Sequence, residues 1–319
     1  MSWKDKATER LDKGESVSRA LARELGIAWS TLSMWYYRQI GKESGNKIKA
    51  HKLNGDVKIL CFDLETFPIL GAVWSLWNNN VGINQIERDW SILSYAAKWV
   101  GSDMTIDNVI YNDVRNQKDI NDDSKLLQEL WDLLDEADIV LTKNGDRFDI
   151  PKLNARFVMA GLPPPSHYKS IDLDKICKRH FGFTSRKLEY LSNELNEKFK
   201  KLKHANFAGY EMWKQCLAGN IDAFNECQEY NSHDVLATEE LYYTLSVWSD
   251  KLPSFFLYSE DEEFKCNCGC KDVKHVGYAY TALSKFDKYQ CVSCGKNYRG
   301  RTNLLTSSKK ENILMNISQ

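Results

Sequence analysis

The segment KILCFDLETFPI, residues 58–69, joins an apolar run to two carboxylates. Its apolar residues are the β-branched and bulky side chains of a sheet interior, so the run predicts a buried strand. Asp63 and Glu65 are two positions apart, and both therefore point to the same face of an extended chain. Two like charges side by side cost free energy unless a cation lies between them or one takes a proton. The segment thus predicts a strand that carries a site.

From residue 57 onward, strand-like and helix-like patterns alternate. Short apolar runs predict strands over residues 57–64, 72–77, 91–100, 106–111 and 138–144. Longer amphipathic runs predict helices over residues 122–137, 148–161 and 222–247. Residues 163–182 hold a turn, a short strand and the start of a helix. This order predicts an α/β domain over residues 57–250, in which helices flank a mixed sheet.

Two later segments add acidic residues to Asp63 and Glu65. In TKNGDRFDIPKL, Asp149 lies just past a short buried strand, at the start of the following helix. In QEYNSHDVLATEELYY, Tyr230 and Asp234 are four positions apart and share one helical face. A mixed sheet can bring the four carboxylates to one point, where they suit two hard cations such as Mg²⁺ or Mn²⁺. Two such cations clamp the attacking and leaving oxygens of a phosphodiester displacement.

The motifs FDLET, NGDRFD and YNSHD, in this order, resemble the three exonuclease motifs of the DEDD family, whose members share a ribonuclease H-like fold. The Tyr-x-x-x-Asp form of the third motif is that of the tyrosine subfamily, found in the proofreading exonuclease domains of family B DNA polymerases. Residues 170–196 resemble the segment between the second and third motifs, and the whole resemblance covers residues 57–247.

The resemblance implies a two-metal exonuclease site. Two Mg²⁺ or Mn²⁺ ions would be held by four carboxylates, those of Asp63, Glu65, Asp149 and Asp234. Tyr230 would orient the attacking water by hydrogen bonding. The implied reaction removes nucleotides from a DNA 3′ end and releases nucleoside 5′-monophosphates.

Two residues compete with this assignment. Asp146 also lies in the second motif and is an alternative ligand to Asp149, which we favour because it completes the Phe-Asp pair. His233 precedes Asp234, but the histidine subfamily places its histidine five residues before the aspartate, where this chain has Glu229. We therefore expect the tyrosine to act, and the histidine to be a solvent-facing neighbour or a substrate contact.

Residues 1–45 predict a small all-α module. In ESVSRALARELGIAWSTLSMWYYRQIG, apolar residues four positions apart make a helix that ends at Gly26. A second helix begins at Ala28 or Ser30, and the whole stretch resembles the helix-turn-helix modules of transposases and phage regulators. The alternative is a helical hairpin used for packing or dimerisation. Residues 46–56 are polar and predict a linker.

Five of the nine cysteines fall between residues 266 and 294, which indicates a metal site and not a disulfide framework. Cys291 and Cys294 form a Cys-x-x-Cys clip. The first knuckle needs two metal ligands but contains three thiols, those of Cys266, Cys268 and Cys270. Cys266 with Cys268 is our first choice, and Cys266 with Cys270 is the alternative. Residues 264–302 resemble a zinc ribbon, which implies one Zn²⁺, while an iron–sulfur cluster is the other possibility.

Basic ends flank an acidic middle, although the formal net charge of the chain is −1. Residues 1–55 carry 11 Lys and Arg against 6 Asp and Glu, and residues 264–319 carry 10 against 3. In the ribbon, basic and aromatic side chains interleave, which suits phosphate contacts and base stacking. A ribbon that only packs or binds protein is the alternative. Residues 303–319 are read as a loose tail.

Together these features predict a stand-alone, phage-type 3′–5′ exodeoxyribonuclease that acts in DNA replication, recombination or repair. Its expected partners are DNA and a replicative polymerase in trans, because too few residues follow position 250 for a polymerase domain. No apolar run could span a bilayer and no secretory signal occurs, so we expect no membrane partner and a cytoplasmic location, that of the bacterial host if the chain is phage-encoded. The alternatives are a non-catalytic DNA-binding regulator or accessory protein and a 3′–5′ exoribonuclease, since the motifs do not distinguish the two kinds of 3′ end.

Overall fold

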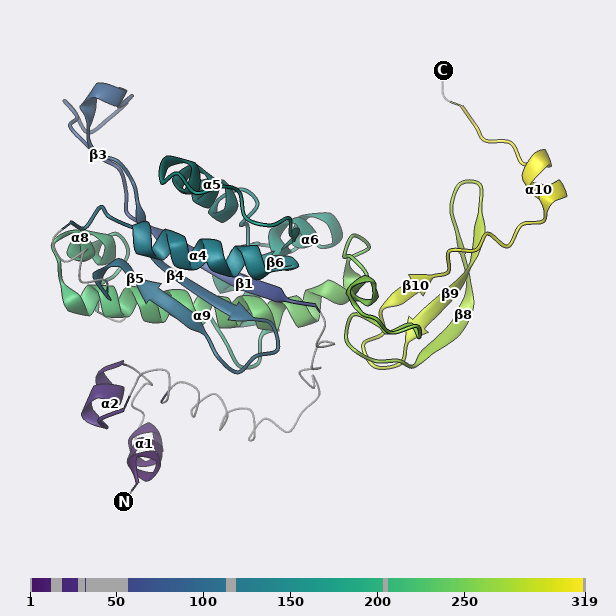
Figure 1. The fold of residues 1–319 in the computed structure, drawn as a ribbon, viewed down its shortest axis with the longest axis horizontal. Helices are drawn as coiled ribbons and strands as arrows, with labels where there is room; N and C mark the ends of the chain where they lie inside the picture. The colour runs from purple at the N-terminus through teal and green to yellow at the C-terminus, as the bar shows by residue number, and fades with distance from the viewer. Residues whose placement is uncertain are drawn as a thin grey trace. The chain divides into compact units, whose positions relative to one another are not determined.

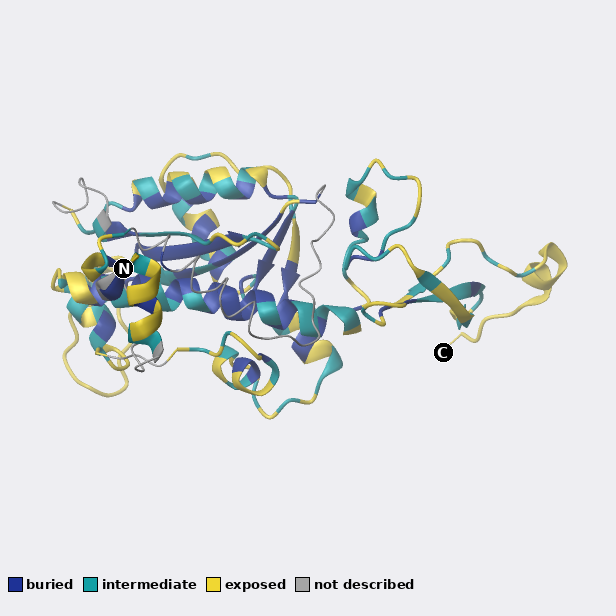
Figure 2. Cartoon of the chain, turned by 90° about the horizontal axis from the view of Figure 1, so that it is seen from below, coloured by how far each residue is buried: buried dark blue, intermediate teal, exposed yellow. Residues whose placement is uncertain are grey.

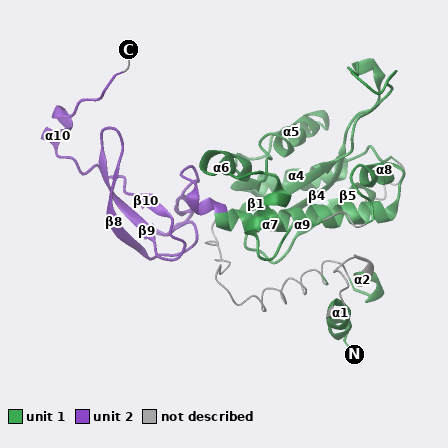
Figure 3. Cartoon of the chain, turned by 180° about the vertical axis from the view of Figure 1, so that it is seen from behind, with its two compact units in different colours: residues 1–47, 58–244 green, residues 48–57, 245–319 purple. Residues whose placement is uncertain are grey.

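The structure is a computed structural model that describes residues 2–12, 19–27, 32, 57–112, 119–202 and 206–317. The chain divides into two compact units, residues 1–47 with 58–244 and residues 48–57 with 245–319 (Figure 3). The first unit contains a five-stranded mixed sheet flanked by helices (Figure 1), which confirms the α/β fold class. None of the described helices is long and apolar enough to cross a membrane.

The central strand of the sheet carries the first two carboxylates. The five strands are β1 (Ile59–Thr66), β4 (Ile92–Trp99), β5 (Ile106–Val109), β6 (Ile139–Thr142) and β7 (Lys169–Asp172), in the order β5-β4-β1-β6-β7. β1 pairs antiparallel with β4 along its length and parallel with β6 only as far as Cys61. The ladder between β1 and β6 therefore ends two residues before Asp63, and the chain that leaves β6 is free to approach this carboxylate.

Helices cover both faces of the sheet. α4 (Ser124–Glu136) and α5 (Asp149–Met159) lie on one face, and α9 (Ile221–Leu245) lies on the other (Figures 1 and 3). Alternate residues of β1, Leu60, Phe62 and Leu64, join the core cluster that contains the buried leucines of α4. Cys61, Asp63 and Glu65 point the other way, and the Sγ atom of Cys61 lies 3.7 Å from the Val235 carbonyl of α9. The most deeply buried parts of this unit are β1, β4, β6 and α9 (Figure 2).

The strand predicted over residues 72–77 is wrong. There the chain forms an arm in which β2 (Leu70–Gly71) pairs with β3 (Ile86–Arg88), followed by the exposed residues Trp74, Leu76 and Trp77. Their side chains favour strands, but in the arm they have neither a paired strand nor a core to cover. The short helices η1 (Ile83–Gln85) and η2 (Ile110–Asn112) lie in the arm and after β5.

Three further helices belong to the first unit, and the first two of them contribute residues to the cleft described below. They are α6 (Leu173–His180), α7 (Leu188–Leu195) and α8 (Glu211–Leu217). The Asp172 side chain caps α6 by accepting a hydrogen bond from the Asp174 amide. α7 and α8 are short and were not expected from the sequence pattern.

Near the N-terminus the structure describes α1 (Trp3–Asp12) and α2 (Arg19–Glu24), with buried Ala7, Leu21, Ala22 and Leu32 between them. Gly26 has φ 69°, and the amides of Gly26 and Ile27 donate to the carbonyls of Arg23 and Ala22. This hydrogen-bond pattern is that of a helix closed by glycine, as predicted for this position. The second helix of the predicted helix-turn-helix lies outside the described residues except for Leu32, so that module stays a prediction.

The second unit is a small three-stranded antiparallel sheet. Its strands are β8 (Val273–Tyr280), β9 (Lys285–Cys291) and β10 (Asn297–Arg299), in the order β10-β9-β8. η3 (Ser246–Trp248) and η4 (Phe255–Tyr258) precede it, and the Asn267 side chain fixes this segment by donating to the Pro253 carbonyl (2.8 Å) and accepting from the Phe255 amide (3.1 Å). α10 (Ser307–Asn312) lies within the residues read as a tail, and Thr306 caps it.

Candidate active site and candidate metal centre

Asp149 is held beside β1 by the way the chain leaves β6. The Leu64 amide donates to Asp149 Oδ1 at 3.2 Å, so the first turn of α5 is anchored to the strand that carries Asp63 and Glu65. In the loop between β6 and α5, a Cβ atom on Gly145 would lie only 2.4 Å from the Thr142 hydroxyl. Only glycine fits this close approach, which explains why the NGD sequence occurs here.

The third motif approaches Asp63 from α9. Asn231, which is fully buried, donates from Nδ2 to Asp63 Oδ2 at 2.7 Å and accepts at Oδ1 from the Ser94 hydroxyl at 3.2 Å. Tyr230 and Asp234 lie one turn apart on the same helix and both line the cleft above β1. The structure thus brings Asp63, Glu65, Asp149, Tyr230 and Asp234 to one cleft, from a strand and two helices.

Lys201 is a member of this site that the sequence analysis missed. Its Nζ atom donates to Asp234 Oδ2 at 2.9 Å, lies 4.7 Å from the centre of the Tyr230 ring, and hydrogen-bonds the side chain of Tyr230. Burial opposes its charge, but Asp234 and Tyr230 raise its pKa above the usual value. Lys201 therefore stays charged and partly neutralises the acids. Asn231 was also missed, although it adjoins Tyr230 in the third motif.

Burial raises the pKa of all four carboxylic acids. The pKa of Asp63 is raised well above its usual range by burial and then by Asp149 and Asp234, and that of Glu65 is raised mainly by burial. Burial raises the pKa of Asp149 to about 7 and that of Asp234 to about 6, the latter against the effect of Lys201. A dehydrated cluster of like charges gains free energy by binding a cation or protons.

Cationic side chains surround this acidic centre. The cleft has a volume of about 790 Å³, and five Lys and Arg residues line it together with the acids, namely Lys143, Arg147, Arg186, Lys187 and Lys201. Asp174 contacts two of these, Lys143 Nζ at 3.0 Å and Arg186 Nε at 3.2 Å. An acidic floor inside a cationic rim can bind a polyanion and a metal at the same place.

The donor set fits hard divalent cations. Asp234 Oδ1 is buried and has no hydrogen-bond partner among the described residues, so one carboxylate oxygen is available for a ligand. In the described part of the chain, no three acidic side chains bring oxygens within 4.8 Å of one another. Two cations a few ångströms apart spread their ligands more widely than one does. The residues that would hold them are Asp63, Glu65, Asp149 and Asp234.

Asp146 and His233 lie apart from this arrangement. Asp146 accepts from the Ser170 hydroxyl and pairs with Lys175 Nζ at 2.5 Å, and it does not line the cleft. His233 is half-buried, not solvent-facing, and its ring meets Phe199 edge-on at 5.9 Å. Burial lowers the pKa of His233 to about 4, so this imidazole is neutral at physiological pH.

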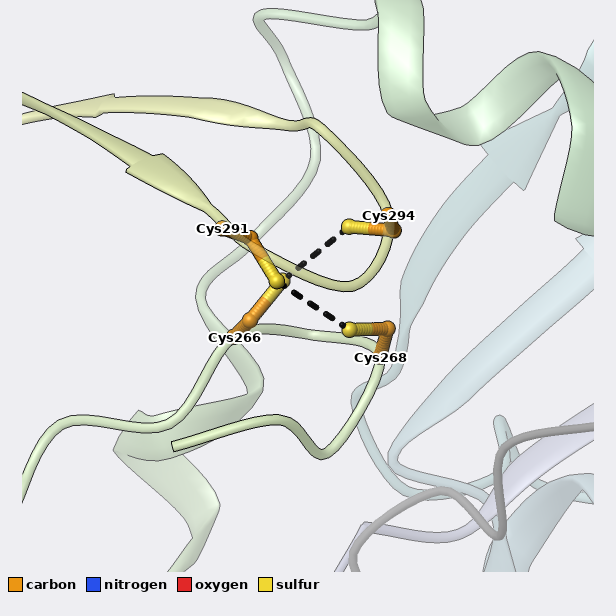
Figure 4. Close-up of side chains that lie close together, drawn as sticks. All are labelled: Cys266, Cys268, Cys291 and Cys294. Carbon is orange, nitrogen blue, oxygen red and sulfur yellow. Dashed lines mark hydrogen bonds between the residues drawn. The ribbon is translucent and has the colours of Figure 1, made fainter. Parts of the chain in front are cut away.

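Four cysteines of the second unit form a candidate metal centre. The sulfurs of Cys266, Cys268, Cys291 and Cys294 lie within 4.8 Å of one another and point toward a common centre (Figure 4). The Sγ atoms of Cys266 and Cys294 are 3.5 Å apart, and the Sγ atom of Cys270 lies outside the group, 3.6 Å from the Asp272 carbonyl. Four thiolates in this arrangement can hold a tetrahedral zinc ion.

The pKa values of the clustered thiols are shifted in opposite directions. The pKa of Cys266 is lowered to about 5 by hydrogen bonding to the Cys294 thiol and, against burial, by the Cys268 amide and the Tyr298 hydroxyl. The Tyr298 oxygen lies 3.0 Å from Cys266 Sγ. The pKa of Cys268 is raised to about 12, mainly by burial, and that of Cys294 is raised by its hydrogen bond to Cys266, so a metal that binds all four thiolates displaces protons.

The family comparison agrees with the fold. A family model described as the RNase H superfamily matches residues 100–246, and the sheet with its flanking helices is ribonuclease H-like. Among solved structures, the family B DNA polymerase from the hyperthermophilic archaeon Pyrobaculum calidifontis is similar, with 16% sequence identity and a TM-score of 0.40. The match covers 60% of this chain and 25% of the polymerase chain, so this chain spans about a quarter of that protein. No curated protein matches the sequence.

Proposed function

We propose that this chain is a metal-dependent 3′–5′ exonuclease that hydrolyses phosphodiester bonds at DNA 3′ ends by a two-metal mechanism. The observation that carries the proposal is the meeting of Asp63, Glu65, Asp149, Asp234 and Tyr230 in one cleft with a cationic rim. The RNase H superfamily match supports a nuclease. The matching order of the three acidic motifs supports the exonuclease reading.

In the proposed reaction, water adds to the phosphorus of the last phosphodiester bond and the P–O3′ bond breaks. The shortened strand keeps a 3′-hydroxyl, and the released nucleotide keeps its 5′-phosphate. Divalent cations held by the carboxylates would supply an activated water and neutralise charge on the phosphate.

The remaining groups bind and orient the substrate. The pKa of Tyr230 is raised to about 12 by burial and by Asp234, so its hydroxyl keeps its proton and can hold the attacking water by a hydrogen bond. Lys201 fixes Tyr230 and Asp234 relative to each other. Lys143 and Arg186, each paired with Asp174, would face the phosphates of the bound strand.

We place this activity in DNA replication, recombination or repair in the cytoplasm, beside a polymerase in trans. The basic ends of the chain support a nucleic-acid substrate. The zinc ribbon proposed for the second unit and the predicted helix-turn-helix would add further DNA contacts.

The test uses a 5′-labelled single-stranded DNA and its blunt duplex, each incubated with Mg²⁺ or Mn²⁺. We expect a ladder that shortens from the 3′ end, and we expect Asp63→Asn to abolish it. Asp146→Asn is the matched control, because it removes an acid of the same motif that lies outside the cleft, and it should keep the ladder. Intact DNA with the wild-type chain would refute a DNA exonuclease, and a ladder on the matched RNA alone would identify an exoribonuclease.

A further inference from the structure

An arm of the first unit carries an exposed apolar surface that the proposed active site does not explain. This tryptophan arm comprises residues 67–91 and projects from the end of β1 (Figures 1 and 3). Four of its apolar side chains are almost fully exposed, Trp74 at 98%, Leu76 at 87%, Trp77 at 81% and Ile83 at 90%. Soluble proteins rarely leave such a group uncovered unless it binds something.

Hydrogen bonds hold the arm in a defined conformation. At its middle, the Gln85 side chain donates to the Ala72 carbonyl at 2.9 Å and accepts from the Gly82 amide at 2.8 Å. At its tip, the Asn79 side chain donates to the Ser75 carbonyl at 2.6 Å, and the Ser75 hydroxyl donates to the Trp77 carbonyl at 2.9 Å. The two indoles are therefore presented by a structured tip.

The base of the arm is continuous with the cleft. The strand that carries Glu65 leads directly into the arm. At the other end of the arm, Trp90 lies under Lys152, whose Nζ is 3.7 Å from the centre of the indole ring. The same Nζ is 5.3 Å from the ring of Phe148, which lines the cleft, and Arg88 covers Phe67 at 5.2 Å. Lys152, a cation that can meet a phosphate, thus lies between the cleft and the arm.

The composition of the arm indicates which ligand it takes. From residue 66 to residue 86 the chain has no charged side chain, but it has two tryptophans, three consecutive asparagines and a glutamine. Indole rings stack on bases of any sequence, and amides can hydrogen-bond base edges. Lys152 at the base of the arm and the cations of the cleft can contact the phosphates, so the tip needs no charge of its own.

We infer that the tryptophan arm binds a single-stranded nucleic acid by stacking Trp74 and Trp77 on bases upstream of the 3′ end that enters the cleft. This inference rests on the proposed exonuclease function, which supplies the 3′ end. The arm then sets how much single strand the chain needs for tight binding.

The test measures binding of 5′-fluorescein DNA by anisotropy, without added Mg²⁺ or Mn²⁺, for oligonucleotides of about 4 and about 16 nucleotides. The double variant Trp74→Ala with Trp77→Ala should bind the longer strand at least about tenfold more weakly and the shorter strand as the wild type does. The double Phe variant, which keeps two stacking rings, should stay within about threefold of the wild type. Val158→Ala, at an exposed apolar site on α5, is the matched control and should change nothing.

The salt dependence of DNA binding shows whether the arm contacts bases or phosphates. Because the arm tip carries no cation, the slope of log Kd against log salt should be the same for the wild type and the double Ala variant. Unchanged affinity for the longer strand would overturn the inference, and a concurrent loss of self-association would assign the arm to a second copy of the chain.

Hydrolysis of the 4-nucleotide strand tests the proposed function separately, since that strand is too short to need the arm. If the chain hydrolyses DNA but the double Ala variant binds the longer strand as tightly as the wild type, the role of the arm is refuted and the exonuclease proposal stands. If the double Ala variant binds more weakly but the wild type hydrolyses nothing, the exonuclease proposal is refuted and nucleic-acid binding by the arm stands.

Discussion

At the scale of single residues, the site depends on partners that hold the acids in place. Asn231 is the clearest case, because its amide joins Asp63 of β1 to Ser94 of β4 through α9. We predict that Asn231→Ala lowers exonuclease activity about 10- to 100-fold, as is usual when a residue that orients a metal ligand is removed. The Mg²⁺ concentration for half-maximal rate should rise.

The neighbouring residue provides the control for this prediction. Ser232 is also buried on α9, but its hydroxyl donates to Asp107 and not to the acids of the cleft. Ser232→Ala should therefore leave the Mg²⁺ dependence unchanged. Equal Mg²⁺ dependence in the Asn231 variant and the wild type would show that Asp63 needs no such support.

The raised pKa values predict how stability depends on pH. The pKa of Asp149 is raised to about 7 and that of Asp234 to about 6, so the folded chain holds protons that the unfolded chain releases near pH 4. Their contribution to stability is present at low pH and is lost as the pH rises through 6 to 7. Without added Mg²⁺ or Mn²⁺, the melting temperature should fall by several degrees between pH 5 and pH 8.

Added divalent cations and one substitution separate this effect from general titration. Mg²⁺ or Mn²⁺ should restore the melting temperature at pH 8, because the cation takes the place of the protons. Asp149→Asn should flatten the pH dependence and reduce the gain from Mg²⁺. A melting temperature that rises from pH 5 to pH 8 in the wild type, with no effect of the substitution, would contradict the raised pKa values.

At the scale of elements, the turn between β6 and α5 sets the position of Asp149. A Cβ atom on Gly145 would overlap the Thr142 side chain, so Gly145→Ala must displace the loop or β6. We predict a loss of about 1–3 kcal/mol in the free energy of unfolding and about 100-fold in activity, because Asp149 moves with the loop. Urea titration measures the free energy of unfolding, and the exonuclease assay measures activity. Gly182→Ala is the control, because a Cβ atom there meets nothing within 4 Å, and it should leave both quantities unchanged.

Which elements could be predicted depended on whether local pattern and tertiary environment agreed. β1, β4 and β6 have apolar runs that the sheet buries, and each was expected within about two residues of its place. Residues 72–77 have the same local preference but no neighbour to pair with, so the pattern was misleading there. A strand exists only where another strand completes its hydrogen bonds.

The residues of the candidate site also fall into two groups, those that a local sequence pattern predicts and those that only the fold brings together. The acidic motifs could be found because their residue types are rare at the ends of buried segments. Lys201 could not, because it stands in a run of similar lysines, and only the fold brings it to Asp234, 33 positions away. Asn231 reaches Asp63 across 168 positions, a distance that no local pattern encodes.

At the scale of the whole molecule, the two units differ in what stabilises them. The first has a large core on both faces of its sheet, whereas in the described part of the second few side chains are buried, among them Phe255, Phe286 and Cys266. So small a core contributes little to stability, and we propose that a metal held by the four sulfurs supplies much of the rest. We therefore expect removal of the proposed zinc ion to unfold the second unit and not the first.

The last prediction follows from this difference. Cys291→Ser should reduce bound zinc from one per chain to none and remove the second unit's transition in a thermal unfolding experiment. The first unit should still melt as before and degrade a short single strand, because no residue of the catalytic cleft belongs to the second unit.

Cys270→Ser is the matched control, since its sulfur lies outside the cluster, and it should keep one zinc per chain. Loss of zinc in the Cys270 variant would mean that the first knuckle pairs Cys266 with Cys270, and unfolding of both units with Cys291→Ser would mean that they fold as one.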